Sequence, residues 1–109
     1  MADKRTTVKF DVFGYAFTII RTDSVERVAK RLGGHIPGAM AQFISLDDEP
    51  MRGYLIFAPD PSPGHIAHES SHAVWHMLKG AGAEMDDETF AYHLQHLVTH
   101  IHKFISKHR

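Results

Sequence analysis

The histidines of segment 65–76 have residue types and a spacing that fit metal chemistry. His68, Glu69 and His72 form the pattern H-E-x-x-H, inside a run from Gly64 to Lys79 that we predict to be helical. Positions four apart lie on one face of an α-helix, so His68 and His72 can direct two imidazoles at one ion. Glu69 lies about 60° around the helix, close enough to orient a water on that ion. The pattern is typical of a zinc hydrolase, in which the metal acidifies the water and the carboxylate takes its proton.

The apolar residues of the same run support a helix with its core on one side and its ligands on the other. We predict that Ala67, Val74, Met77 and Leu78 form the buried stripe. The H-E-x-x-H residues fall on the far side, as expected for ligands that face a cleft. The alternative is a solvated polar face that happens to carry histidines.

A catalytic zinc usually takes a third protein ligand and keeps one position open for water. We predict Glu88 as this ligand, because it stands at the start of the last predicted helix, and a short glycine-containing turn can bring that helix back beside the first. Tyr92 follows Glu88 at a spacing of four, and its hydroxyl is a candidate catalytic group for a developing oxyanion. The rival third ligands are Glu84, Asp86, Asp87 and His76.

The motif of His68, Glu69 and His72 followed by Glu88 resembles the gluzincin group of zinc metallopeptidases. The amino-acid sequence of residues 68–74 and 86–92 is also similar to that of small phage and prophage proteins described as peptidases. The resemblance covers about residues 64–99. It implies Zn²⁺ as the cofactor, Glu69 as the general base and a peptide or protein as the substrate.

Together with the strands and helices predicted for the rest of the chain, this resemblance leads us to expect a single small zincin-like α+β domain spanning residues 1–109. We expect a short antiparallel or mixed sheet, one helix in the N-terminal half, and two C-terminal helices that carry the site. The alternative function is a non-catalytic metal-binding module of phage or prophage origin that contacts another protein. A third hypothesis is a globular protein without metal, in which the motif is accidental.

Other side chains near the motif leave further alternatives open. His65 and His76 lie about one turn beyond the central pair, so one ion cannot bind all four histidines; His76 is a candidate for a second metal. Trp75 flanks the same face, where it lines a substrate pocket or simply packs at the rim. A second stripe on the last helix offers another metal site or a pH-sensitive surface; it consists of His93, His96 and His100.

We predict that the rest of the chain forms short strands and two further helices. We predict strands at 6–12, 15–21, 40–46 and 53–58, with an acidic turn at 47–50 and a loop at 35–38. A helix capped by Asp23 or Ser24 ends at Gly33. The proline-rich segment 59–64 leads into the motif helix, and Asp86 or Asp87 caps a last helix over 87–107. Its predicted buried stripe is Phe90, Leu94, Leu97, Val98, Ile101, Phe104 and Ile105.

Composition narrows the class of protein. The 109 residues are 43% hydrophobic, which suits one domain with a core. The net charge of −1 and the lack of a long basic run make nucleic acid an unexpected partner. Without cysteine there is no disulfide and no thiolate zinc site. Neither a signal core in residues 1–5 nor an apolar run of about 20 residues is present, so we expect no membrane association and a cytoplasmic location.

Overall fold

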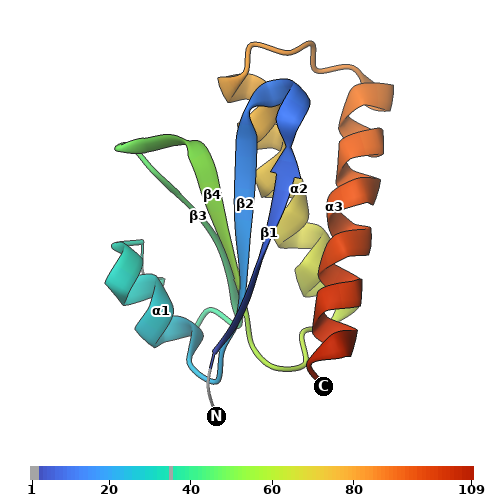
Figure 1. Ribbon diagram of the computed structural model, residues 1–109. Coiled ribbons are helices and arrows are strands. Elements are labelled where there is room, and N and C mark those ends of the chain that lie inside the picture. The colour runs from blue at the N-terminus through green and yellow to red at the C-terminus, as the bar shows by residue number, and fades with distance from the viewer. Residues whose placement is uncertain (1–2, 35) are drawn as a thin grey trace.

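The computed structural model describes residues 3–34 and 36–109, in which one mixed sheet carries helices on both faces (Figure 1). Met1, Ala2 and His35 lie outside the described residues, and with them part of the expectations for the N-terminus and the 35–38 loop. The elements in chain order are β1 (Lys4–Phe10), the 3₁₀ turn η1 (Asp11–Phe13), β2 (Tyr15–Arg21), α1 (Val25–Leu32), β3 (Ala41–Leu46), β4 (Glu49–Phe57), α2 (Pro63–Gly80) and α3 (Asp87–Lys107).

The first hairpin forms where the sequence predicts it, with the first strand shifted two residues toward the N-terminus. β1 pairs antiparallel with β2 from Lys4 to Phe10, and residues 11 and 12 of the predicted strand belong instead to the 3₁₀ turn Asp11–Phe13. Gly14 closes the turn at φ 64°, a left-handed conformation that glycine adopts without a Cβ clash. Val12 is exposed, so its apolar side chain gains nothing from continuing the strand.

α1 is confirmed with the predicted cap. The Ser24 side chain accepts a hydrogen bond from the backbone N–H of Arg27 (3.2 Å), which satisfies one of the free donors at the helix start. Gly33 ends the helix at φ 87°. The buried face, which includes Val25, Val28 and Ala29, packs with Ile20, Ile44 and Ile56 of the sheet.

The second hairpin is tighter than predicted, because β4 begins at Glu49 rather than Gly53. Leu46 pairs with Glu49, so the acidic turn contains Asp47 and Asp48 only. Tyr54 donates a hydrogen bond from its hydroxyl to Glu49 Oε2 (2.7 Å) and fixes the start of the strand. Pro50 is tolerated there because β2 pairs with β4 only from Arg52 onward.

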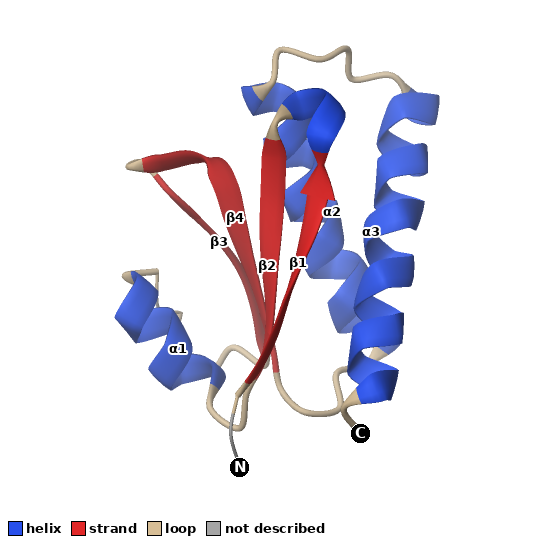
Figure 2. Ribbon diagram, viewed as in Figure 1, coloured by secondary structure: helices blue, strands red, loops and turns tan. Residues whose placement is uncertain are grey.

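The sheet order β1-β2-β4-β3 leaves β1 and β3 as its two outer strands. β2 and β4 are parallel and central, whereas β3 pairs antiparallel with β4 only. α1 covers one face over β3 and β4, and α2 and α3 cover the other (Figure 2). On that second face α2 lies over β3 and β4, and α3 lies beside β1. The motif helix therefore lies next to the outer strand β3.

α2 and α3 form an antiparallel pair joined by segment 81–86 (Figure 1). The Ser62 hydroxyl caps α2 by accepting from the His65 N–H (3.0 Å). The predicted apolar stripe of α2 is correct for Val74, Met77 and Leu78 but wrong for Ala67, which is exposed. Ile66 and Ala73 are buried as well, so the buried face of the helix extends to one side of the predicted stripe, and Ala67 lies at its opposite edge near the start of the helix.

α3 matches its prediction closely. Asp86 caps it by accepting from the Thr89 N–H (2.8 Å). Its fully buried residues are Leu97, Ile101, Phe104 and Ile105, and the other three of the predicted stripe pack half-buried at the rim of the main core. The α+β class, the mixed sheet and the arrangement of three helices are thus confirmed. Within residues 3–34 and 36–109, no helix combines the length and apolar character that crossing a membrane requires.

Candidate metal centre

His68 and His72 project side by side from the solvent-facing side of α2. Their Nε2 atoms are 3.2 Å apart, and the two rings meet edge to face with centroids 4.8 Å apart. The His68 side chain is 67% exposed, so no desolvation of the imidazole opposes the approach of an ion. The predicted i, i+4 pairing of the two imidazoles is therefore present in the fold.

Glu69 lies beside this pair and is held by the outer strand β3. Its Oε1 accepts a hydrogen bond from the backbone N–H of Phe43 (2.8 Å), and its Oε2 lies 3.8 Å from His68 Nε2. The side chain is only 14% exposed. One oxygen is thus fixed by the strand, while the other faces the histidines, an orientation that a general base at this position requires.

A cavity of about 400 Å³ opens between α2 and β3 at this point. Residues from both elements and from the segment before β3 surround it. Its lining consists of Ile36, Ala41, Gln42, Phe43, His68, Glu69, His72, Trp75 and His76. Trp75 lines this cavity and is also exposed at its rim, so the structure is compatible with both alternatives that the sequence leaves open for it.

The lining from β3 is the part of the site that sequence reasoning missed. The pattern of segment 40–46 predicts a strand. Nothing in that pattern shows that the strand lies at the edge of the sheet, or that it lies beside α2. The backbone N–H that holds Glu69 carries no sequence signal, because every residue except proline has one. Only the strand order brings Phe43 to the motif.

The structure does not bring Glu88 to the histidine pair. Glu88 is exposed in the first turn of α3, next to the C-terminal end of α2. His72 lies eight residues before Gly80, about 12 Å further down the α2 axis at 1.5 Å per residue. Glu84, Asp86 and Asp87 belong to the same end of the helix pair. In the described part of the chain, no group of three or more histidine, aspartate or glutamate side chains is arranged to hold a metal ion.

Tyr92 is also placed away from the pair. It is 68% exposed on α3, its ring lies 5.4 Å from that of His93, and it lines a separate shallow cavity. His76 does line the site cavity, half-buried against Phe43 (ring centroids 5.7 Å apart). The contact with Phe43 gives His76 a packing role whether or not it binds metal.

The second histidine stripe occupies a different environment. The rings of His93 and His96 pack on Phe10 of β1, at 5.7 and 5.3 Å, and His96 meets His100 at 4.6 Å. Burial lowers the pKa of His96, and the nearby His100 and His93 lower it further. The lowered pKa favours the neutral form of His96, whose ring packs on Phe10 at the edge of the core.

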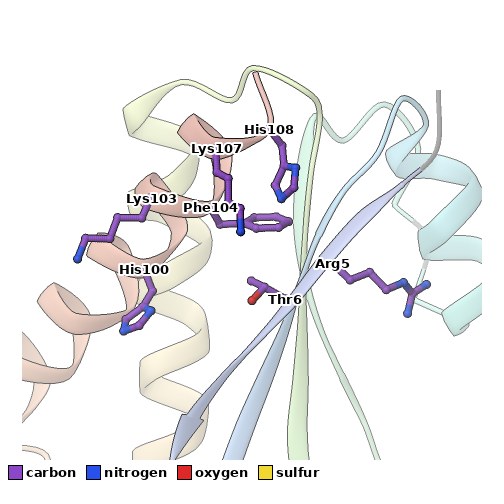
Figure 3. Close-up of a pocket in the computed structure, with 7 residues that line it drawn as sticks. All are labelled: Arg5, Thr6, His100, Lys103, Phe104, Lys107 and His108. Atoms are coloured by element: carbon purple, nitrogen blue, oxygen red, sulfur yellow. The ribbon is translucent and has the colours of Figure 1, made fainter.

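A cationic cavity of about 230 Å³ lies beyond His100, between β1 and the C-terminal end of α3. Figure 3 shows Thr6 on β1 opposite Phe104, Lys107 and His108, with the Arg5 side chain pointing away across the strand. Among the residues that the structure describes, none of those lining this cavity is acidic. It is therefore a poor place for a metal cation.

No protein-family model, curated protein or solved structure matches this chain. The resemblance to gluzincin peptidases therefore depends on the motif residues alone.

Proposed function

We propose that this protein is a metal-dependent hydrolase that uses His68 and His72 as zinc ligands and Glu69 as the general base. The observation that carries the proposal is the 3.2 Å separation of the two Nε2 atoms. With Zn–N bonds of about 2.0–2.1 Å, this separation corresponds to an angle of about 100° at the ion, close to tetrahedral. The separation of the two nitrogens therefore suits two ligands of one zinc ion.

Zinc bound here would lower the pKa of a water and polarise a substrate carbonyl. The protein's own contribution to the step is the Glu69 carboxylate. Its Oε2 is free to take a proton from the attacking water and to pass it to the leaving amine, while Oε1 stays on the Phe43 N–H. The strand thus fixes the base relative to the two histidines.

A peptide is the substrate class that we propose, and the outer strand supports it. The Phe43 N–H points away from β4, since it donates to Glu69, and alternation along a strand gives Ala41 and Ser45 the same orientation. Backbone groups on the free edge of a sheet can pair with an extended peptide. Such a peptide would pass across the cavity that contains the histidines.

Glu88 as third ligand and Tyr92 as catalytic group remain predictions from the sequence. For Glu88 to reach the ion, segment 81–86 and the first turn of α3 would have to move toward His72. With Glu88 in its present place, a zinc ion on His68 and His72 would leave its other positions to solvent and substrate. We propose a cytoplasmic location, which the absence of cysteine supports.

The test is peptide hydrolysis by the zinc-loaded chain, measured by mass spectrometry on a mixed peptide library. We expect cleavage by the wild type and none by Glu69→Gln, although that variant binds the same amount of zinc. Glutamine is a matched replacement because its side-chain carbonyl oxygen can still accept from the Phe43 N–H. Equal cleavage by both proteins would refute the proposed base.

The second candidate function is a metal-binding interaction module without catalysis. It is favoured by the fact that the fold supplies two histidines on an exposed face and, among the described residues, leaves the third ligand position unfilled by protein. A partner protein would then complete the coordination. Zinc binding without cleavage of any library peptide, in wild type and variant alike, would select this function.

A further inference from the structure

Trp75 separates the site cavity from a second cavity that is mainly apolar. This second cavity, of about 480 Å³, lies between the C-terminal half of α2 and the start of α3, and Trp75 lines both. Trp75 follows His72 by one helical turn and is 53% exposed. The other lining residues are Met85, Asp86, Asp87, Phe90 and Ala91.

The rim of this second cavity is strongly acidic. Glu84, Asp86, Asp87 and Glu88 occur within five residues and are all exposed. The backbone N–H of Thr89 donates a hydrogen bond to the Asp86 carboxylate and lowers the pKa of Asp86. Between residues 77 and 92 the only lysine or arginine is Lys79.

These features go beyond what a helix start needs. Asp86 is the cap, and one more acidic group in the first turn would complement the helix dipole. The exposed apolar surface of Trp75 and Met85 is not explained by either role. An exposed apolar patch with a charged rim, adjacent to a candidate active site, is instead typical of a surface that binds a ligand.

We propose that Trp75 and its cavity are a specificity subsite for a peptide with a large apolar side chain and a basic residue beyond it. This proposal rests on the metal-dependent peptidase function proposed above. The apolar side chain would insert between Trp75 and Phe90, next to the scissile bond. Lysine or arginine would then meet the acidic rim, where opposite charge favours it.

The distance from His72 to the acidic rim determines how far the basic residue lies from the cleaved bond in the substrate. The rim lies about 10–15 Å from His72, since eight helical residues alone separate His72 from the end of α2. An extended peptide advances about 3.3 Å per residue. The basic residue is therefore expected three to five positions from the cleaved bond.

The experiment measures binding of labelled, end-capped decapeptides by fluorescence polarisation to the zinc-loaded Glu69→Gln chain, which we expect not to cleave them. The probes carry one phenylalanine and two lysines four residues away, in either order along the peptide. Control peptides replace the phenylalanine by serine or the lysines by glutamates. We expect at least one order to bind about ten-fold more tightly than both controls. Equal binding of all peptides would overturn the subsite.

Variants of the chain assign the effect to the proposed residues. Trp75→Ala should remove the preference for phenylalanine, whereas Val12→Ala, an exposed apolar change on the 3₁₀ turn, should leave it intact. Glu84→Gln combined with Asp87→Asn should lower the lysine preference several-fold. Asp47→Asn with Asp48→Asn, the same change of charge in the β3–β4 turn, should not. No difference between these two double variants would overturn the role of the rim.

The same binding measurement on the metal-free chain separates this inference from the proposed function. Selective peptide binding without any zinc uptake would support the subsite and refute the hydrolase. Zinc binding and cleavage with no preference among the peptides would support the hydrolase and refute the subsite.

Discussion

The two helices of the C-terminal half each carry a histidine pair at a spacing of four, and the pairs differ in their neighbours. His68 and His72 on α2 have ring centroids 4.8 Å apart, and His96 and His100 on α3 have centroids 4.6 Å apart. The first pair lies beside the Glu69 carboxylate, which β3 holds in place. In the second pair, His96 packs on Phe10, and His100 borders a cavity lined by Arg5, Lys103 and Lys107.

The comparison shows that helical spacing alone does not define a metal site. Lysines near His100 repel a divalent cation, whereas a carboxylate near His68 attracts it. The Nε2 atoms of the first pair lie 3.2 Å apart. Among the described residues, no hydrogen bond between ring nitrogens joins the second pair. Charge and orientation therefore assign the candidate metal site to α2.

The largest expected difference between the pairs is in stabilisation by zinc. Free zinc at about 100 times its dissociation constant should stabilise the folded chain by about 2.7 kcal/mol, which raises Tm by about 10 °C for a domain of this size. His72→Ala should abolish this rise, and the matched change His100→Ala should keep it. Differential scanning calorimetry with and without zinc measures both. A rise that depends on His100 would reverse the assignment.

The next largest effect concerns the carboxylate that distinguishes the pairs. Glu69→Gln should lower kcat by about 10²–10⁴, the range expected for loss of a general base. Zinc affinity, measured by isothermal titration calorimetry, should change by less than about three-fold, since the side chain is not a ligand in this account. A variant with unchanged kcat would show that Glu69 only anchors α2 to β3.

A smaller effect is expected for Glu88→Gln. Because Glu88 lies in the first turn of α3, away from His72, the substitution should change zinc affinity less than about two-fold. A loss as large as that of His72→Ala would show that the start of α3 closes onto the ion, and would support the ligand predicted from the sequence. Calorimetric titration of both variants in one buffer decides between the two.

The smallest effect is the pH response of the α3 pair. The pKa of His96 is lowered from 6.5 by burial and by the neighbouring histidines, so the folded state binds this proton less readily than the unfolded chain. Its contribution to stability is therefore present above pH 6.5 and is lost as the pH falls through the lowered value. His96→Gln should make the decline in Tm between pH 7 and pH 5 slightly shallower. An unchanged or steeper decline would contradict the lowered pKa.

Local patterns predict the elements of this fold well, because helix caps and hydrophobic periodicity depend on residues that are close together in the sequence. Ser24, Asp86 and the stripe from Leu97 to Ile105 all act as the sequence indicates. The prediction fails for Ala67 because this residue lies at the edge of the buried face near the start of α2, and only the packing of the helix shows where that face ends.

The candidate site was predictable only in the part that lies on one helix. The pair on α2 and Glu69 follow from spacing, but the hydrogen bond from Phe43 depends on β3 being an outer strand. The prediction of Glu88 as a ligand requires a short turn that brings the start of α3 beside His72. The turn returns it level with Gly80 instead, because α2 continues for eight residues past His72.

The most direct measurement of the central claim is the zinc content of the chain purified without a histidine tag and dialysed, by elemental analysis. We predict about one zinc per chain in the wild type and in His100→Ala, and none in His72→Ala. No zinc in any of the three proteins after exposure to the metal, or zinc that His72→Ala retains, would contradict the metal centre on α2 and the function proposed from it.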